Sequence, residues 1–170
     1  MKRNHSADDT RKLLSYIRDY YPEAAIRTTL ITGYPAETEH DFSLLMDYIT
    51  EFRFDRLGVF TYSHEEDTYA YKNSADSIPE KVKRERADQI MAVQQEISLE
   101  RNLNLAGNEL KVLIDRKEGE YLIARSEYDS PDIDQEIFVR ADQRELHPGD
   151  FCNVLVTGAT EFDLRASLLP

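Results

Sequence analysis

The sequence is poor in cysteine, because Cys152 is the only one among its 170 residues. A single thiol excludes an internal disulfide and a metal site built from several thiolates of this chain. We interpret Cys152 as a small buried hydrophobic residue. Long apolar runs are also absent and polar residues follow Met1, so the sequence predicts neither a membrane span nor a signal peptide. The default expectation is a cytoplasmic protein.

Recognisable catalytic motifs are missing as well. The sequence has no phosphate-binding glycine loop and no serine or cysteine in a nucleophile elbow. None of its histidines shares a helix face with a second ligand at three- or four-residue spacing: His5, His40, His64 and His147. The run from His64 to Asp67 could attract a hard cation. Four consecutive loop residues cannot all face one ion, so a solvated loop is the preferred interpretation.

Negative charge is unevenly distributed along a chain whose 41% apolar content is typical of a globular protein. Residues 1–102 carry 14 Lys/Arg and 19 Asp/Glu, a net charge of −5. Residues 103–170 carry 7 and 14, a net charge of −7 in a shorter stretch. The C-terminal part is therefore the acidic one.

The most acidic segment, residues 125–136, lies between two strand-like stretches. It contains five carboxylates and no cation after its first residue: Glu127, Asp129, Asp132, Asp134 and Glu136. Such a surface repels nucleic acid and attracts a basic partner. A solvated loop without a partner is the alternative interpretation.

The first 62 residues predict alternating helices and strands. Ser6 and Thr38 can each cap a helix. Residues 25–32 and 57–62 are rich in β-branched or apolar residues and predict strands. This order with short connections is typical of a parallel sheet covered by helices. Two strands cannot stabilise such a sheet alone, so we expect the chain to be part of something larger.

Residues 63–78 lack an apolar period and are predicted to form a loop. Pro79 suits the first turn of a long helix that continues to Asn104. One apolar stripe runs along this helix, at Val82, Ile90, Val93 and Ile97. We interpret the helix as a connector between two domains.

From Glu109 onward, apolar residues recur with a period of two. Turn-forming residues separate five such stretches, at 110–114, 121–123, 137–139, 154–156 and 162–164. Five short strands predict a small closed antiparallel barrel, which removes exposed edges. The predicted fold class is thus α/β followed by all-β, with an α/β part over 1–78, a connecting helix over 79–106 and a β-barrel over 107–170.

The carboxyl ends of parallel strands hold the reacting groups of α/β barrels. In this chain those ends fall at residues 31–35 and 61–63. Gly33 would let a ligand approach the backbone, although a turn glycine is an equally good interpretation. Arg27, inside an otherwise apolar strand, predicts a buried guanidinium that meets either a structural carboxylate or a polar ligand cavity.

Residues 27–39 and 54–63 resemble the late barrel strands of the radical S-adenosylmethionine methylthiotransferases. The first six residues resemble the segment that leads into this region, and the C-terminal module resembles the TRAM domain that follows the barrel. One branch of the family modifies adenosine in tRNA, and the other, RimO, modifies an aspartate of the small-subunit ribosomal protein S-twelve. Residues 56–63 and the acidic segment resemble the RimO branch. Ala36 departs from the family, which usually has glycine there.

The resemblance implies an enzyme that uses S-adenosylmethionine and two 4Fe-4S clusters to add a methylthio group to an aspartate β-carbon. The family holds these clusters with a CxxxCxxC motif and three further cysteines, which this sequence lacks. It therefore implies that the chain is the C-terminal portion of such an enzyme. We expect this portion to be inactive by itself and to bind none of these cofactors.

The resemblance also implies which residues border the cofactor and the substrate. No residue is assigned to catalysis or to a metal, because the clusters carry the chemistry. Candidate neighbours of S-adenosylmethionine are Arg27, Thr29, Ile31, Gly33, Phe60 and Tyr62. Candidate substrate-recognition residues are the five carboxylates of the acidic segment, because ribosomal proteins are basic.

Two alternatives remain open. One is the tRNA-modifying branch, although RNA binding is not expected because the β module lacks a cluster of Lys and Arg. The other is a protein-binding module without enzymatic activity. In either case half of a parallel barrel leaves strand edges and apolar side chains without neighbours, so we expect the chain to self-associate.

Overall fold

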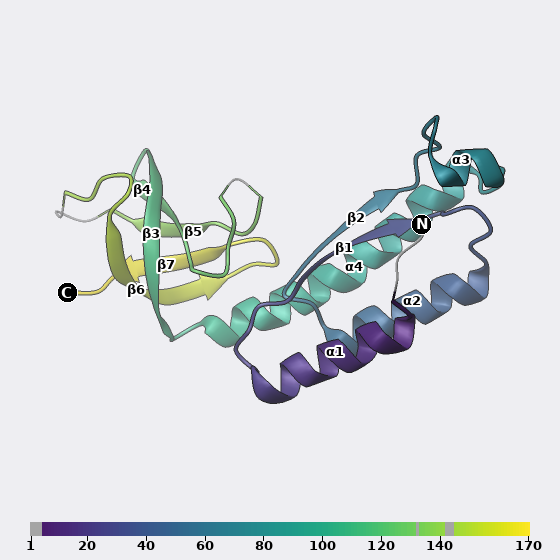
Figure 1. The fold of residues 1–170 in the computed structure, drawn as a ribbon. Coiled ribbons are helices and arrows are strands. Elements are labelled where there is room, and N and C mark those ends of the chain that lie inside the picture. Colours follow the sequence, from purple (N-terminus) through teal and green to yellow (C-terminus); the bar gives the residue numbers. More distant parts are fainter. Residues whose placement is uncertain (1–4, 132, 142–144) are drawn as a thin grey trace. The chain divides into compact units, whose positions relative to one another are not determined.

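The computed structural model describes residues 5–131, 133–141 and 145–170. Their contacts divide the chain into two compact units, Met1–Gln94 and Gln95–Pro170. Helix α4 (Glu80–Leu105) begins in the first unit and ends in the second (Figure 1). The unit boundary therefore lies inside this helix.

The first unit is a helix-covered pair of strands. Its described elements are, in chain order, α1 (Ala7–Tyr20), β1 (Arg27–Thr32), α2 (Glu39–Phe52), β2 (Arg56–Thr61), α3 (Tyr69–Asn73) and the first part of α4. The predicted helix, strand, helix, strand order is confirmed. The predicted loop over 63–78 is wrong in part, because Thr68 caps the short helix α3 by accepting a hydrogen bond from Tyr71 N.

Both predicted helix caps are confirmed. In α1 the Ser6 hydroxyl accepts a hydrogen bond from Asp9 N, and the Asp9 carboxylate accepts one from Ser6 N. Thr38 and Asp41 form the same reciprocal pair at the start of α2. The hydrogen bond from the Thr38 side chain, followed by that from its backbone, holds the pKa of Asp41 below the usual value of aspartate.

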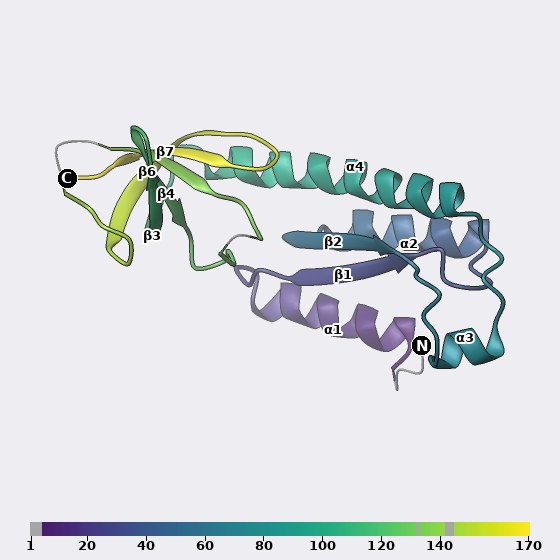
Figure 2. The same ribbon diagram turned by 90° about the horizontal axis from the view of Figure 1, so that it is seen from above.

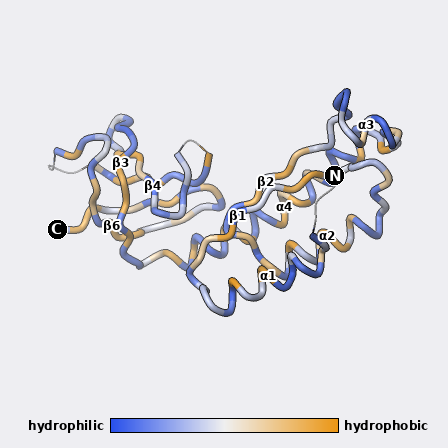
Figure 3. Tube along the Cα trace, in the orientation of Figure 1, coloured by the Kyte–Doolittle hydropathy of each residue, from blue (hydrophilic) through white to orange (hydrophobic). Residues whose placement is uncertain are grey.

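Strands β1 and β2 pair in parallel, with Arg27 beside Arg56 at one end and Thr32 beside Thr61 at the other. Helices α1 and α2 lie on one side of the two strands (Figures 1 and 2). Side chains alternate between the two faces of a strand, so every second residue points toward these helices. Apolar residues lie along β2 and in the second half of β1 (Figure 3). The core of the unit contains Ile49, Phe54 and Ile90.

The buried face of α4 differs from the predicted apolar stripe. Ile90 and Ile97 are buried as expected, whereas Val82 and Val93 are only partly buried. The buried positions recur every three or four residues and include two cations and an amide: Lys83, Arg86, Ile90, Gln94 and Ile97. The sequence pattern missed this face because it counted only apolar residues.

The second unit is a closed five-stranded barrel with the strand order β3-β4-β5-β7-β6. Its strands are β3 (Glu109–Glu118), β4 (Tyr121–Arg125), β5 (Ile137–Arg140), β6 (Phe151–Ala159) and β7 (Leu164–Leu168). The closed barrel was predicted correctly. The expected stretch at 162–164 was misplaced, because β7 begins at Leu164 and Phe162 is exposed in the preceding turn.

One pair of barrel strands is parallel, so the prediction of a fully antiparallel barrel was wrong in that respect. β5 pairs with β7 in parallel, and the other neighbours are antiparallel. A ring with an odd number of strands cannot alternate direction at every junction, so a closed five-stranded barrel must contain a parallel pair. Its interior is filled by buried aliphatic side chains, including Ile137, Val139, Val154 and Leu164. Cys152 is only partly buried and packs against this core.

None of the described helices is both long enough and apolar enough to cross a membrane.

We predict that the chain self-associates through the face of β1 and β2 that α1 and α2 do not cover. Phe60 on this face is 65% exposed, and both strands lie at a sheet edge. Sedimentation should detect a concentration-dependent dimer that Phe60→Glu weakens. Phe162→Glu is the matched control, because Phe162 is 55% exposed and belongs to the barrel unit. A strictly monomeric chain would contradict this prediction.

Candidate functional site

The uncovered sheet face carries four of the six candidate cofactor neighbours. Arg27, Thr29 and Ile31 are exposed on β1, and Phe60 lies beside Ile31 in the register of β2. Strand alternation brings these side chains to one face. The expectation of a buried guanidinium was wrong, because Arg27 is exposed.

A gap interrupts this face at Gly58. Gly58 pairs with Thr29 near the middle of the two strands. A Cβ added at Gly58 would meet no heavy atom within 4 Å. The face therefore presents a flat, open position next to the exposed side chains of Ile31 and Phe60, which can accommodate the planar part of a ligand.

The remaining two candidates, Gly33 and Tyr62, follow the carboxyl ends of the strands and are buried. Gly33 has a φ of +73°, and a Cβ there would lie 2.3 Å from Lys83 Cγ. A side chain is thus excluded both by backbone strain and by the stem of Lys83. The Gly33 N–H donates to both carboxylate oxygens of Glu37, each at 3.1 Å.

Tyr62 lies at the centre of a row of rings at this edge. Its ring meets Tyr34 edge-on with the centroids 5.3 Å apart, and its hydroxyl lies 2.9 Å from His64 Nδ1. The His64 ring is in turn 4.7 Å from that of Tyr71. Burial raises the pKa of Tyr62 above the ordinary value of tyrosine, so its hydroxyl stays protonated at neutral pH.

Two buried cations of α4 bind the loops that follow the strands. The Arg86 guanidinium contacts Glu37 at 2.5 Å and Glu39 at 2.7 Å. The Lys83 ammonium contacts Asp76 at 2.7 Å. Burial acts to lower the pKa of Arg86, but hydrogen bonds to Glu39 and Glu37 outweigh it and leave the pKa above the usual value. Arg86 is therefore charged throughout the accessible pH range.

Sequence reasoning missed this set of ion pairs. The available signal was the spacing of Lys83 and Arg86, which places both on the same helix face as Ile90 and Ile97. In the turn after β1, Ala36 adopts a φ of 70°, in the region that favours glycine.

The acidic segment is mostly engaged in local contacts. Asp129 is buried, with 6% of its surface exposed, and accepts a hydrogen bond of 2.5 Å from the Ser126 hydroxyl. Asp134 accepts a hydrogen bond of 2.6 Å from the backbone N–H of Ser130. These two carboxylates fold the loop onto itself.

The other three candidate carboxylates differ in their surroundings. Glu136 forms an ion pair with Arg116 at 2.7 Å. Glu127 is exposed to solvent. Asp132 lies outside the described residues. Among the described carboxylates of the segment, Glu127 is thus the most accessible to a partner.

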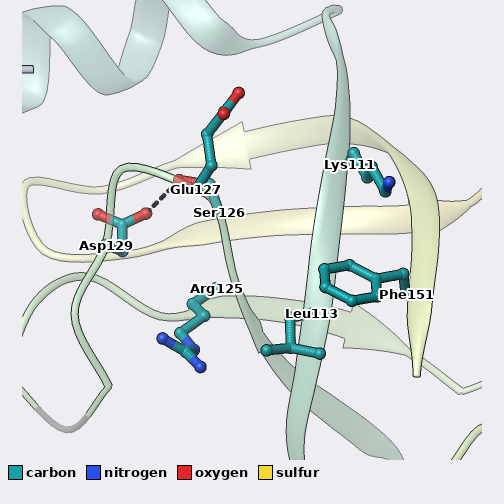
Figure 4. A pocket seen from close by; sticks show the side chains of 7 residues that line it. All are labelled: Lys111, Leu113, Arg125, Ser126, Glu127, Asp129 and Phe151. Atoms are coloured by element: carbon teal, nitrogen blue, oxygen red, sulfur yellow. Dashed lines mark hydrogen bonds between the residues drawn. The ribbon is translucent and has the colours of Figure 1, made fainter. Parts of the chain in front are cut away.

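A groove of about 310 Å³ opens beside this segment (Figure 4). It is lined by Lys111, Leu113, Arg125, Ser126, Glu127, Asp129 and Phe151. Leu113 and Phe151 are register partners on β3 and β6. The Lys111 ammonium lies 5.0 Å from the centroid of the exposed Phe151 ring, and Arg125 is paired with Asp115. The groove thus combines an apolar floor with charges of both signs.

Residues 106–169 match the TRAM domain family. This part of the chain is a TRAM domain. Over 96% of its length the chain is 50% identical to a ribosomal protein uS12 methylthiotransferase RimO of Christiangramia forsetii. Proteins of the same name from Phocaeicola vulgatus and Cytophaga hutchinsonii are 46% and 49% identical over 99% of the chain. The predicted resemblance to the C-terminal part of the RimO branch is confirmed.

The chain spans 36–39% of the length of these curated relatives. A solved multidomain protein with nucleic-acid-binding domains, from Streptococcus pneumoniae, is 19% identical, with a TM-score of 0.31. The match covers 41% of this chain and 24% of that protein's chain. That likeness supports no inference about function. Within the described residues, no group of three His, Cys, Asp or Glu side chains is arranged to hold a metal ion.

We predict that Arg86→Met destabilises the first unit by about 3 kcal/mol, because it leaves the Glu37 carboxylate buried without its cation. Urea unfolding followed through the amide resonances of β1 and β2 measures this loss. Arg84→Met is the matched control, since Arg84 lies on the exposed side of the same helix and pairs only with Glu80 in the described contacts. Equal effects of the two substitutions would show that burial of the Arg86 ion pairs is unimportant.

Proposed function

We propose that the chain forms the C-terminal part of a ribosomal protein uS12 methylthiotransferase, which adds a methylthio group to the β-carbon of an aspartate. The observation that carries the proposal is the identity of 46–50% to three proteins of that name over 96–99% of the chain. The helix-covered parallel strands and the TRAM domain agree with such an enzyme.

In this proposal the uncovered sheet face is part of the wall that binds S-adenosylmethionine. The face fits a nucleoside, because Gly58 leaves an open position beside the exposed side chains of Ile31 and Phe60. Arg27 and Thr29 supply polar groups on the same face. Gly33 and Tyr62 shape the carboxyl edge and do not lie on the open face. When bound, S-adenosylmethionine and the clusters supply the radical, sulfur-transfer and methyl-transfer chemistry.

The iron–sulfur clusters do not fit the residues of this chain. A cluster of this family requires three thiolates, and the chain has only Cys152. We therefore assign the cluster ligands to other parts of the complete enzyme and propose that residues 1–170 by themselves are inactive. Because the proposed substrate is a ribosomal protein, the proposed compartment is the cytoplasm.

The barrel unit is proposed to recognise the substrate. Its net negative charge favours approach of a basic ribosomal protein and disfavours RNA. Of the described candidate carboxylates, Glu127 has the exposure that this role needs, and it lies in the wall of the groove. Asp129 acts indirectly, because its buried carboxylate fixes the loop that carries Glu127.

We predict that this chain can replace the matching region of the Christiangramia forsetii protein without loss of activity. Mass spectrometry of uS12 should detect methylthiolation by the chimera. Phe60→Ala should raise the KM for S-adenosylmethionine about tenfold, because the ring supplies apolar contact area. Phe162→Ala in the barrel is the control and should leave KM unchanged. A folded, cluster-loaded chimera without activity would refute the proposed function.

We predict opposite effects for two groove substitutions on binding of uS12 to the chain. Glu127→Gln should slow association at low salt, and Lys111→Gln should accelerate it, because the second removes a repelling cation. Both effects should shrink as salt is added. Stopped-flow association rates across a salt series measure them. If Lys111→Gln slows association instead, the partner surface is anionic, and a parallel titration with RNA would identify it.

A further inference from the structure

Lys83 is a buried cation at the carboxyl edge of the sheet. Only 2% of its surface is exposed. Its ammonium donates to Asp76 at 2.7 Å and to the Tyr62 carbonyl at 3.2 Å, and it lies 5.2 Å from the Tyr62 ring centroid. A buried ammonium is tolerated only with such partners. The position of Lys83 is therefore tied to both Asp76 and Tyr62.

The same residue also contacts the end of the other strand. The Thr32 hydroxyl donates a hydrogen bond of 3.1 Å to the Lys83 carbonyl. The side-chain stem of Lys83 occupies the space that a Cβ of Gly33 would fill. Lys83 thus contacts Thr32, which ends β1, and approaches Gly33, which follows it. It also contacts Tyr62, which follows β2.

Segment 63–76, which contains α3, makes contacts near both of its ends. At its start, the Tyr62 hydroxyl meets His64, whose ring packs on Tyr71 in α3. At its end, Asp76 meets Lys83. Between these points Glu65, Glu66 and Asp67 are exposed. In Figure 1 the segment lies beyond the carboxyl ends of β1 and β2.

We propose that Lys83 is a positioning residue of the cofactor wall, and that its ammonium holds segment 63–76 against the carboxyl ends of β1 and β2. The inference rests on the proposed function for its consequence, because Gly33 and Tyr62 border the proposed cofactor site. Lys83 itself lies on α4 and acts through these two residues. Without its charge, the Asp76 carboxylate and the Tyr62 carbonyl lose their shared donor, and the segment is no longer tied at its end.

Hydrogen exchange of the 170-residue chain tests the positioning directly. Lys83→Met keeps the apolar stem against Gly33 and removes the charge. We expect amides of segment 63–76 to exchange at least about tenfold faster in this variant and in Asp76→Asn. The double variant should add little to either single change, because both break the same contact. Lys83→Arg should restore part of the protection.

Lys81→Met is the matched control, since Lys81 is on the same helix turn with 86% of its side chain exposed. Amides of the barrel unit serve as an internal reference in every sample. Unchanged exchange of segment 63–76 in Lys83→Met or in Asp76→Asn would overturn the proposal. So would additive effects of the two substitutions.

The functional consequence is measured in the chimeric enzyme. Lys83→Met should raise the KM for S-adenosylmethionine about tenfold with a much smaller change in kcat, because a displaced wall weakens binding. A lowered kcat at unchanged KM would contradict positioning of the cofactor wall. A parent chimera without activity would refute the proposed function alone, because the exchange experiment decides whether Lys83 positions the segment.

Discussion

The ion pairs that Lys83 and Arg86 make at the start of α4 hold the carboxyl ends of the two parallel strands. Both cations are buried, and burial of a charge is tolerated only with a partner of opposite sign. Arg86 binds the loop after β1 through Glu37, and Lys83 binds the segment after β2 through Asp76. Gly33 is where these contacts meet, since its N–H binds Glu37 and its missing side chain admits Lys83.

This arrangement separates the structural face of the sheet from the face proposed for function. Helices α1 and α2 cover one side, so the residues that point there are committed to packing. The opposite side leaves Ile31 and Phe60 exposed beside the gap at Gly58. The proposed cofactor wall is built on two strands whose carboxyl ends are held by these buried contacts, which favours accurate positioning of its side chains.

The barrel unit shows how a surface that looks uniformly acidic in sequence becomes differentiated in the fold. Asp129 and Asp134 are used to close their own loop, and Glu136 is paired with Arg116. The groove beside them joins Lys111 and Phe151 from two strands with Glu127 from the loop. The net charge governs the long-range approach of a partner, whereas this local mixture governs what can dock.

The sequence by itself determined the features that depend on neighbouring residues. The caps at Ser6 and Thr38, the helix–strand order and the period-two strands of the barrel follow from local hydrogen bonding and side-chain periodicity. Alternation also placed Arg27, Thr29 and Ile31 together. Only the tertiary structure decided that Arg27 is exposed, that Lys83 and Arg86 are buried, and that β5 and β7 run parallel. Each of these depends on partners distant in sequence or on ring closure, which no local pattern encodes.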